Sequence, residues 1–185
     1  MRKLVKVAVV AVGLFFAGNA VQAQQKFGHI NSGELLQSMP EMKAADASFK
    51  TFQDQKENQL KQMDAERQKK ITSYQEKART ISEANKEVVG KEMEALAKEI
   101  QDMEKRIQET QQKAQQELQA KQTELYTPIY KKAEDAVRAV SKEKGYAYVF
   151  DTSQPGVVYF DGGDDIISVV KAKLGIAASA PSAKK

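Results

Sequence analysis

The chain has 185 residues, of which 41% are apolar and only 7% aromatic, so it can form one domain with a modest core. It contains no Trp and no Cys, and the absence of Cys excludes a disulfide framework and a lipid-attachment cysteine. Setting aside three basic residues near the N-terminus leaves 26 basic against 25 acidic side chains, and so small a surplus argues against a general nucleic-acid binder.

Residues 1–23, MRKLVKVAVVAVGLFFAGNAVQA, have the composition of a secretory signal peptide. A basic start precedes an apolar run from Val7 to Ala17, and the small residue Ala23 ends the segment. The run is too short to span a bilayer comfortably, and no later stretch approaches the length of a transmembrane helix. We therefore expect export, cleavage after Ala23 and a soluble mature protein.

Residues 41–124 are predicted to form a long helical arm. Apolar residues recur at gaps of three and four along two seams, 42–81 and 89–107, which is the spacing of a coiled coil. The polar stretch before Gly90 predicts a turn near position 88, so that the two seams face each other in an antiparallel hairpin. A continuous rod that pairs with another chain is the alternative.

Residues 24–40 and 125–175 are predicted to form a small β-rich body. Within it, 26–31 and 145–151 are typical of strands, and we expect 156–161 to pair with 145–151 across a turn. The predicted fold class is therefore α+β, with a long antiparallel coiled-coil hairpin on a small β-rich oligomerisation body.

Other signals mark the edges of the body. Pro128 predicts a new helix start and a bend where the arm meets the body. Asp164 or Asp165 is expected to cap a short amphipathic helix that ends at Gly175, and residues 176–185 are predicted to be disordered.

The body is expected to assemble with copies of itself. Its predicted strands are short and few, and a small sheet with open edges is marginal alone. This argument predicts a homo-oligomer without fixing its order. Apolar residues of the predicted strands are the candidates for the contact: Ile30, Val149, Phe150, Val158 and Phe160.

These features together resemble the OmpH/Skp family of periplasmic chaperones. The resemblance is carried by FGHINSGELLQSMPEM at 27–42, by the charged hairpin, and most specifically by GYAYVFDTSQPGVVYFDGGDDIISVVKAKL at 145–174. It implies a periplasmic homotrimer with a β-rich body and three helical arms. It also implies a central cavity between the arms that holds unfolded outer-membrane proteins without nucleotide.

Apolar residues along the arm are candidates for binding such unfolded clients. Methionine is unbranched and polarizable, so it suits surfaces that accept many partners, although filling gaps in the seam is the alternative. Two phenylalanines one turn apart near the base of the arm are further candidates. The full set is Met42, Phe49, Phe52, Met63, Met93 and Met103.

A basic stretch lies near the predicted tip of the arm. Between residues 67 and 91 there are seven basic side chains against three acidic ones. We expect this tip to meet anionic lipid headgroups or acidic clients within about 8 to 10 Å, the Debye length at physiological salt; an ordinary solvated surface is the alternative. The basic residues are Arg67, Lys69, Lys70, Lys77, Arg79, Lys86 and Lys91.

No catalytic, metal or cofactor site is expected. The single histidine, His29, has no Cys or second His to complete a nucleophilic or zinc site. The run DGGDD at 161–165 lacks the alternating ligands and final Glu of an EF-hand loop, and no GxxxxGK[ST] phosphate loop occurs. The sequence therefore predicts an ATP-independent holdase chaperone, with a passive coiled-coil spacer of the cell envelope as the alternative.

Overall fold

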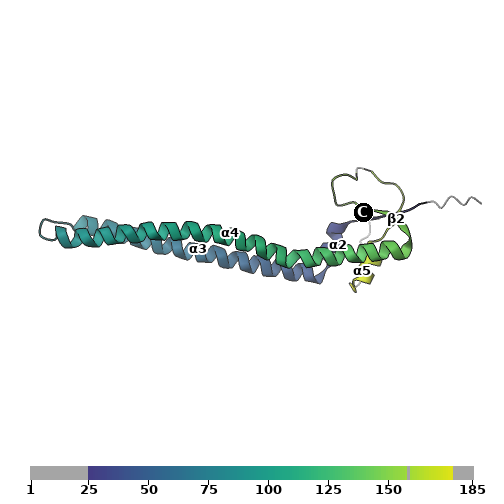
Figure 1. The fold of residues 1–185 in the computed structure, drawn as a ribbon, viewed down its shortest axis with the longest axis horizontal. Helices are drawn as coiled ribbons and strands as arrows, with labels where there is room; N and C mark the ends of the chain where they lie inside the picture. Colours follow the sequence, from purple (N-terminus) through teal and green to yellow (C-terminus); the bar gives the residue numbers. More distant parts are fainter. Residues whose placement is uncertain (1–24, 158, 177–185) are drawn as a thin grey trace, which may run out of the picture.

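A small body carries one long two-helix arm (Figure 1). The structure is a computed structural model that describes residues 25–157 and 159–176. The predicted signal peptide, Val158 and the tail beyond residue 176 lie outside the described residues. The elements in chain order are β1 (Lys26–Ile30), α2 (Ser32–Ser38), α3 (Pro40–Thr80), α4 (Lys86–Lys144), β2 (Tyr146–Asp151), β3 (Asp164–Asp165) and α5 (Ile167–Lys173).

The arm is an antiparallel hairpin of α3 and α4, as predicted, and the continuous rod is excluded. The polar loop 81–85 joins the two helices at the end of the arm that lies far from the body. Asn85 closes this loop, because its amide donates to the Thr80 carbonyl at 2.9 Å and its oxygen accepts from the Ser82 N–H at 2.6 Å. The turn therefore comes slightly before position 88, and Gly90 lies inside α4.

Helix α4 continues through Pro128, so the predicted restart at this residue is wrong. Proline removes one backbone hydrogen bond from a helix interior and therefore disfavours continuation. Here the helix is held on both sides of the proline, since Ile129 and Val140 are buried in the core and Leu125 packs against it. The helix ends instead at Gly145, whose φ of 71° is left-handed and whose N–H donates to the carbonyls of Ser141 and Lys142.

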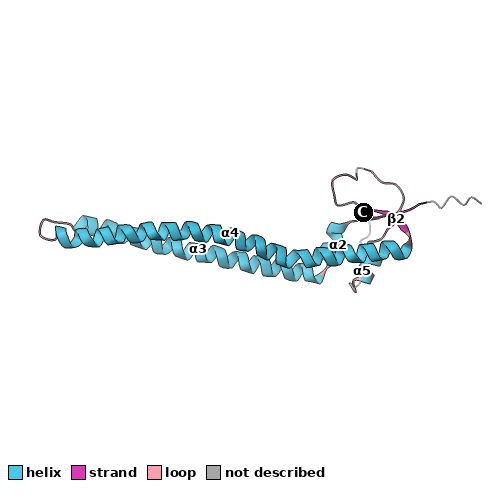
Figure 2. Ribbon diagram, in the orientation of Figure 1, coloured by secondary structure: helices cyan, strands magenta, loops and turns pink. Residues whose placement is uncertain are grey.

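The sheet has the order β2-β1-β3, and both pairings are parallel. His29 lies between Phe150 and Asp165, and Figure 2 shows how small a share of the fold these strands make up. Residues 157 and 159–161 lie outside any strand, so the predicted pairing of 156–161 with 145–151 is wrong. These residues belong instead to the connection from the end of β2 to β3, which pairs in parallel with β1 on the far side of the sheet and so must start at the same end as β2.

One hydrophobic core joins both ends of the chain. The side chains of Leu35, Met39, Val140, Ile166 and Val170 are fully buried, and they come from the N-terminal segment, the end of α4 and α5. Each such burial contributes about 1.5–3 kcal/mol relative to an exposed side chain. The close packing also explains Gly28, since a Cβ there would lie 3.3 Å from both Ile166 and Tyr146.

Gly90→Ala should stabilise the tip of the arm. A Cβ at this helical position would meet nothing within 4 Å, and alanine in a helix is favoured over glycine by about 0.5–1 kcal/mol. We expect slower amide hydrogen exchange around residues 86–92. As the matched control, Gly145→Ala also meets no atom within 4 Å but forces a side chain onto a φ of 71°, so it should destabilise the protein. Faster exchange in Gly90→Ala would contradict this reading of the tip.

Candidate interaction surfaces

Three exposed aromatic side chains form a stacked layer on one side of the sheet, which we call the aromatic face: Phe27, Tyr148 and Phe150. Their ring centroids lie 5.9 to 6.4 Å apart, and the side chains are 43%, 58% and 48% exposed. A β-bulge creates this layer, because one step from Lys26 to Phe27 on β1 matches two steps from Tyr146 to Tyr148 on β2. The bulge lets Tyr146 pack against the core while Tyr148 lies exposed.

The predicted assembly residues fall into two groups. Phe150 and Phe160 are 48% and 52% exposed, and the Phe160 ring lies against His29 at a tilt of 43°, with ring centroids 4.7 Å apart. Ile30 is buried in the core of its own chain, and Val149 packs against that core. Phe27 and Tyr148 were not predicted. Tyr148 lies two residues before Phe150, beyond the bulge, so the alternation of faces along β2 could have found it. The assembly role of the predicted residues stays a prediction.

Asp151 ties the end of β2 to the start of α2. Its carboxylate accepts from the Ser32 N–H at 3.1 Å and from the Ser32 hydroxyl at 2.6 Å, and also from the N–H and hydroxyl of Ser153. Burial raises the pKa of Asp151, but the hydrogen bonds from Ser32 and Ser153 outweigh it and hold that pKa below its ordinary value. This carboxylate therefore stabilises the joint between two ends of the chain in its ionised form.

A second polar cluster joins all three strands of the sheet. The Tyr146 hydroxyl donates to Asp164 at 2.6 Å, and the Lys26 ammonium lies 2.9 Å from the same carboxylate and 4.3 Å from the Tyr146 ring centroid. The hydrogen bonds from Tyr146 and Lys26 lower the pKa of Asp164. Together these contacts hold all three strands in register, although the cluster is exposed to solvent.

The apolar candidates of the arm all lie on the seam between α3 and α4. Met42 and Met103 are buried, while Phe49, Phe52, Met63 and Met93 are half-buried. Side chains that fill gaps in the seam must lie between the helices, as these do. A client could contact most of their surface only where the two helices separate. Their role in binding stays a prediction.

Ion pairs cross the arm along most of its length. They join Lys56 to Glu117 at 2.5 Å and Arg67 to Glu104 at 3.6 Å. Three further cross-arm pairs are Glu41–Lys132, Lys70–Glu99 and Lys77–Glu92. Exposed pairs of this kind contribute only about 0.2–1 kcal/mol each, but a shift of register would break all of them together.

These pairs change the electrostatics of the predicted basic tip. The returning helix brings acidic side chains beside the basic stretch, so residues 67–104 contain eight basic and eight acidic groups. Lys86 and Lys91 also pair locally with Glu83 and Glu87. Of the seven predicted basic residues, Lys69 and Arg79 have no ion pair within 4.0 Å among the described residues. Binding of lipid or acidic clients at the tip stays a prediction.

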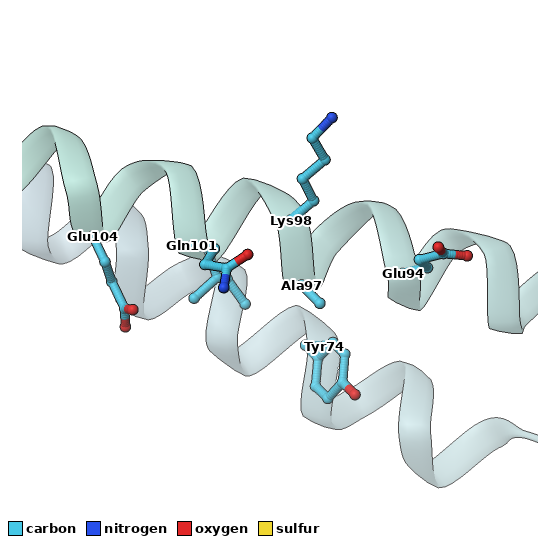
Figure 3. Close-up of a pocket in the computed structure, with 7 residues that line it drawn as sticks. Tyr74, Glu94, Ala97, Lys98, Gln101 and Glu104 are labelled. Carbon is cyan, nitrogen blue, oxygen red and sulfur yellow. The ribbon is translucent and has the colours of Figure 1, made fainter.

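Small residues on the seam leave hollows between the helices. Near the tip, a hollow of about 500 Å³ is lined by both helices, and Figure 3 shows the Tyr74 ring beside Ala97 while Lys98 points away from the partner helix. Closer to the body, a second hollow of about 490 Å³ lies over Leu60, Ala114 and Leu118. Both hollows lie open to solvent beside the seam.

The described residues hold neither a membrane-spanning helix nor a cluster of metal ligands. No described helix has the length and apolar content needed to cross a membrane. In the same part of the chain, His, Asp and Glu side chains form no group of three that could hold a metal ion.

The fold defines a class of α+β proteins in which a helical hairpin projects from a small parallel sheet. The chain matches the family described as "Outer membrane protein (OmpH-like)" over residues 26–174, and it belongs to this family. The sequence resemblance to this family is thereby confirmed. No curated protein matches the chain at a significant level.

A solved structure supports the fold. It is the crystal structure of a protein from Caulobacter crescentus that was assigned provisionally as an OmpH-like outer membrane chaperone, and it matches with a TM-score of 0.66. The two chains are 20% identical, and the match covers 82% of this chain and 85% of the other. At this identity the similarity establishes the shared fold alone.

Asp151→Asn should lower the free energy of unfolding by about 1–3 kcal/mol at neutral pH, because the charged acceptor of several hydrogen bonds is lost. The folded-state pKa of Asp151 is lowered, so its stabilisation is complete above the unfolded-state value of about 4 and is lost as pH falls through the folded-state value. Urea unfolding of the variant and the wild-type protein should therefore differ at neutral pH and converge in acid.

The control for this experiment is Asp161→Asn, which changes an exposed loop carboxylate in the same part of the body. We expect this substitution to leave the urea midpoint nearly unchanged at every pH. A gap between Asp151→Asn and wild type that stayed constant from neutral to strongly acidic pH would show that the charge of Asp151 does not matter.

Proposed function

We propose that the protein is an ATP-independent holdase chaperone of the periplasm, which binds unfolded outer-membrane β-barrel proteins between helical arms and prevents their aggregation. The observation that carries this proposal is the length of the arm. Helix α3 has 41 residues and would be about 60 Å long at 1.5 Å per residue. Membership of the OmpH-like family and the predicted signal peptide support the cellular setting.

The arm supplies surface rather than core. Its helices meet along one thin seam, while the fully buried side chains belong to the body. So much exposed helix is not needed to stabilise the body, so the arm is suited to contacts outside its own chain. Binding along several arms would be weak at each contact and strong in sum, which is an effective-concentration effect.

We propose that the body forms a homotrimer through its aromatic face. Exposed, stacked aromatic side chains beside the open edges of a small sheet favour burial against another copy. The number three rests on the resemblance to the OmpH/Skp family. A trimer would place three arms around one cavity, and release would follow when a client folds into a membrane and withdraws its apolar surface.

The basic residues without ion pairs suggest where the tip would act. Lys69 and Arg79 are exposed on the distal part of α3. We propose that these two, rather than the whole basic stretch, would meet anionic lipid headgroups. Their contribution would be weakened by added salt, because exposed charges are screened beyond about 8 Å at physiological ionic strength.

Replacing residues 50–120 with a short glycine–serine loop should abolish protection of clients while leaving the body assembled. The deletion removes the distal arm but keeps both segments that form the core. Light scattering of an unfolded β-barrel protein, diluted from urea with stoichiometric chaperone and without ATP, measures the effect. Full protection by the shortened protein would move the binding surface to the body, and no protection by the full chain would favour the passive spacer.

The double substitution Tyr148→Ser and Phe150→Ser should reduce the oligomer to smaller species. Both side chains are exposed on the aromatic face, so their loss removes apolar contact area without opening the core. Multi-angle light scattering at micromolar concentration gives the mass, and Tyr130→Ser, which changes a 52% exposed aromatic of α4, is the matched control. A monomeric wild-type protein would refute the assembly proposal, and a wild-type dimer would remove the number three.

A further inference from the structure

A groove lined by glutamine side chains lies across the middle of the arm. Its floor is apolar and comes from both helices, with Leu60 on α3 and Ala114 and Leu118 on α4. Its walls include the amide side chains of Gln53, Gln111 and Gln115, and the side chains of Lys56 and Glu57 complete the lining. We call this hollow of about 490 Å³ the glutamine groove.

The amide surface continues along α4 toward the tip. A neighbouring hollow of about 410 Å³ shares Gln111 and Gln115 with the glutamine groove. The rest of its lining is Lys105, Gln108, Glu109 and Gln112. Two adjoining hollows therefore present a row of neutral amides, while the cross-arm ion pairs Lys56–Glu117 and Arg67–Glu104 lie on either side of Leu60 and Ala114.

We propose that the glutamine groove binds extended segments of unfolded polypeptide, with client side chains on the apolar floor and client backbone hydrogen-bonded to the glutamine amides. This inference rests on the proposed holdase function and identifies a site for it. Each glutamine offers two donors and a carbonyl acceptor, so it can pair with the N–H or C=O of any residue. Recognition of this kind is independent of client sequence.

The chemistry of the groove favours an extended chain over a second helix. A helix satisfies its own backbone groups, so a helix of another copy would offer the amide walls only side chains. An extended unfolded chain presents backbone donors and acceptors that lose water on binding and need new partners. The lining of each hollow carries no net charge, because Lys56 is offset by Glu57 and Lys105 by Glu109, so it would not select an acidic or a basic ligand.

The direct test replaces Gln53, Gln111 and Gln115 together by alanine in the full mature chain. The matched control replaces three other exposed glutamines of the same helices, Gln62, Gln116 and Gln119, which line neither hollow. Alanine favours helix in both variants, so the arm should stay folded. Fluorescence anisotropy with a labelled, urea-unfolded β-barrel protein gives the Kd of each.

We expect the groove variant to bind at least about tenfold more weakly, because several hydrogen bonds are lost. The control should bind within about twofold of wild type, and raising NaCl from about 50 mM to about 500 mM should change wild-type affinity little. Equal affinity of the groove variant and wild type would overturn the inference while leaving the holdase function intact. Absence of binding by the wild-type protein would instead refute the holdase function.

A second measurement does not depend on the stability of a triple variant. A photo-crosslinking amino acid placed at position 111 should capture the bound client, whereas the same group at position 116 should capture little. Both positions are exposed on α4, so the comparison separates the groove from general collision with the arm. Equal capture at the two positions would contradict a specific groove.

Discussion

The parallel pairing of β1 with β2 is the constraint on which the rest of the structure depends. Parallel neighbours cannot be joined by a tight turn, so the chain must leave the sheet and return to the same end. Here the whole of α2, α3 and α4 lies between the two strands. The arm is therefore the crossover connection itself. Since closing a long flexible loop costs entropy, a hairpin that folds back on itself brings β1 and β2 together at lower cost.

The same constraint explains why stability is divided unevenly. Contacts between the two chain ends are concentrated in the body, where Ser32 and Asp151 bond across 119 residues of sequence. The arm has only a seam one side chain wide, so its register depends on polar contacts as well as on packing. Small residues such as Ala97 and Ala114 fit this design, because they let the two helices meet along a narrow seam and leave shallow hollows open to solvent beside it.

Sequence predicted the arm better than the body because helical periodicity is local. The seam spacing placed Met42, Phe49 and Tyr74 correctly on the inner side of α3, but Ile81 lies 45% exposed in the loop beyond the helix. Strand pairing is not local: β-propensity in 156–161 could not reveal that the neighbour of β2 is β1. Counting charge along the chain could not show the acidic partners of the basic stretch for a similar reason, since some of them come from the returning helix.

Body and arm carry different chemistry, and this difference bears on how a chaperone without ATP can release its clients. The aromatic face of the body exposes large apolar rings, and burial of such surface favours lasting assembly. The arm groove exposes neutral amides over a narrow apolar floor. Water satisfies an empty amide nearly as well as a peptide does, so each such contact is worth only about 0.5–1.5 kcal/mol net. Contacts of that strength retain a client when many act together, and they yield one at a time as the client begins to fold.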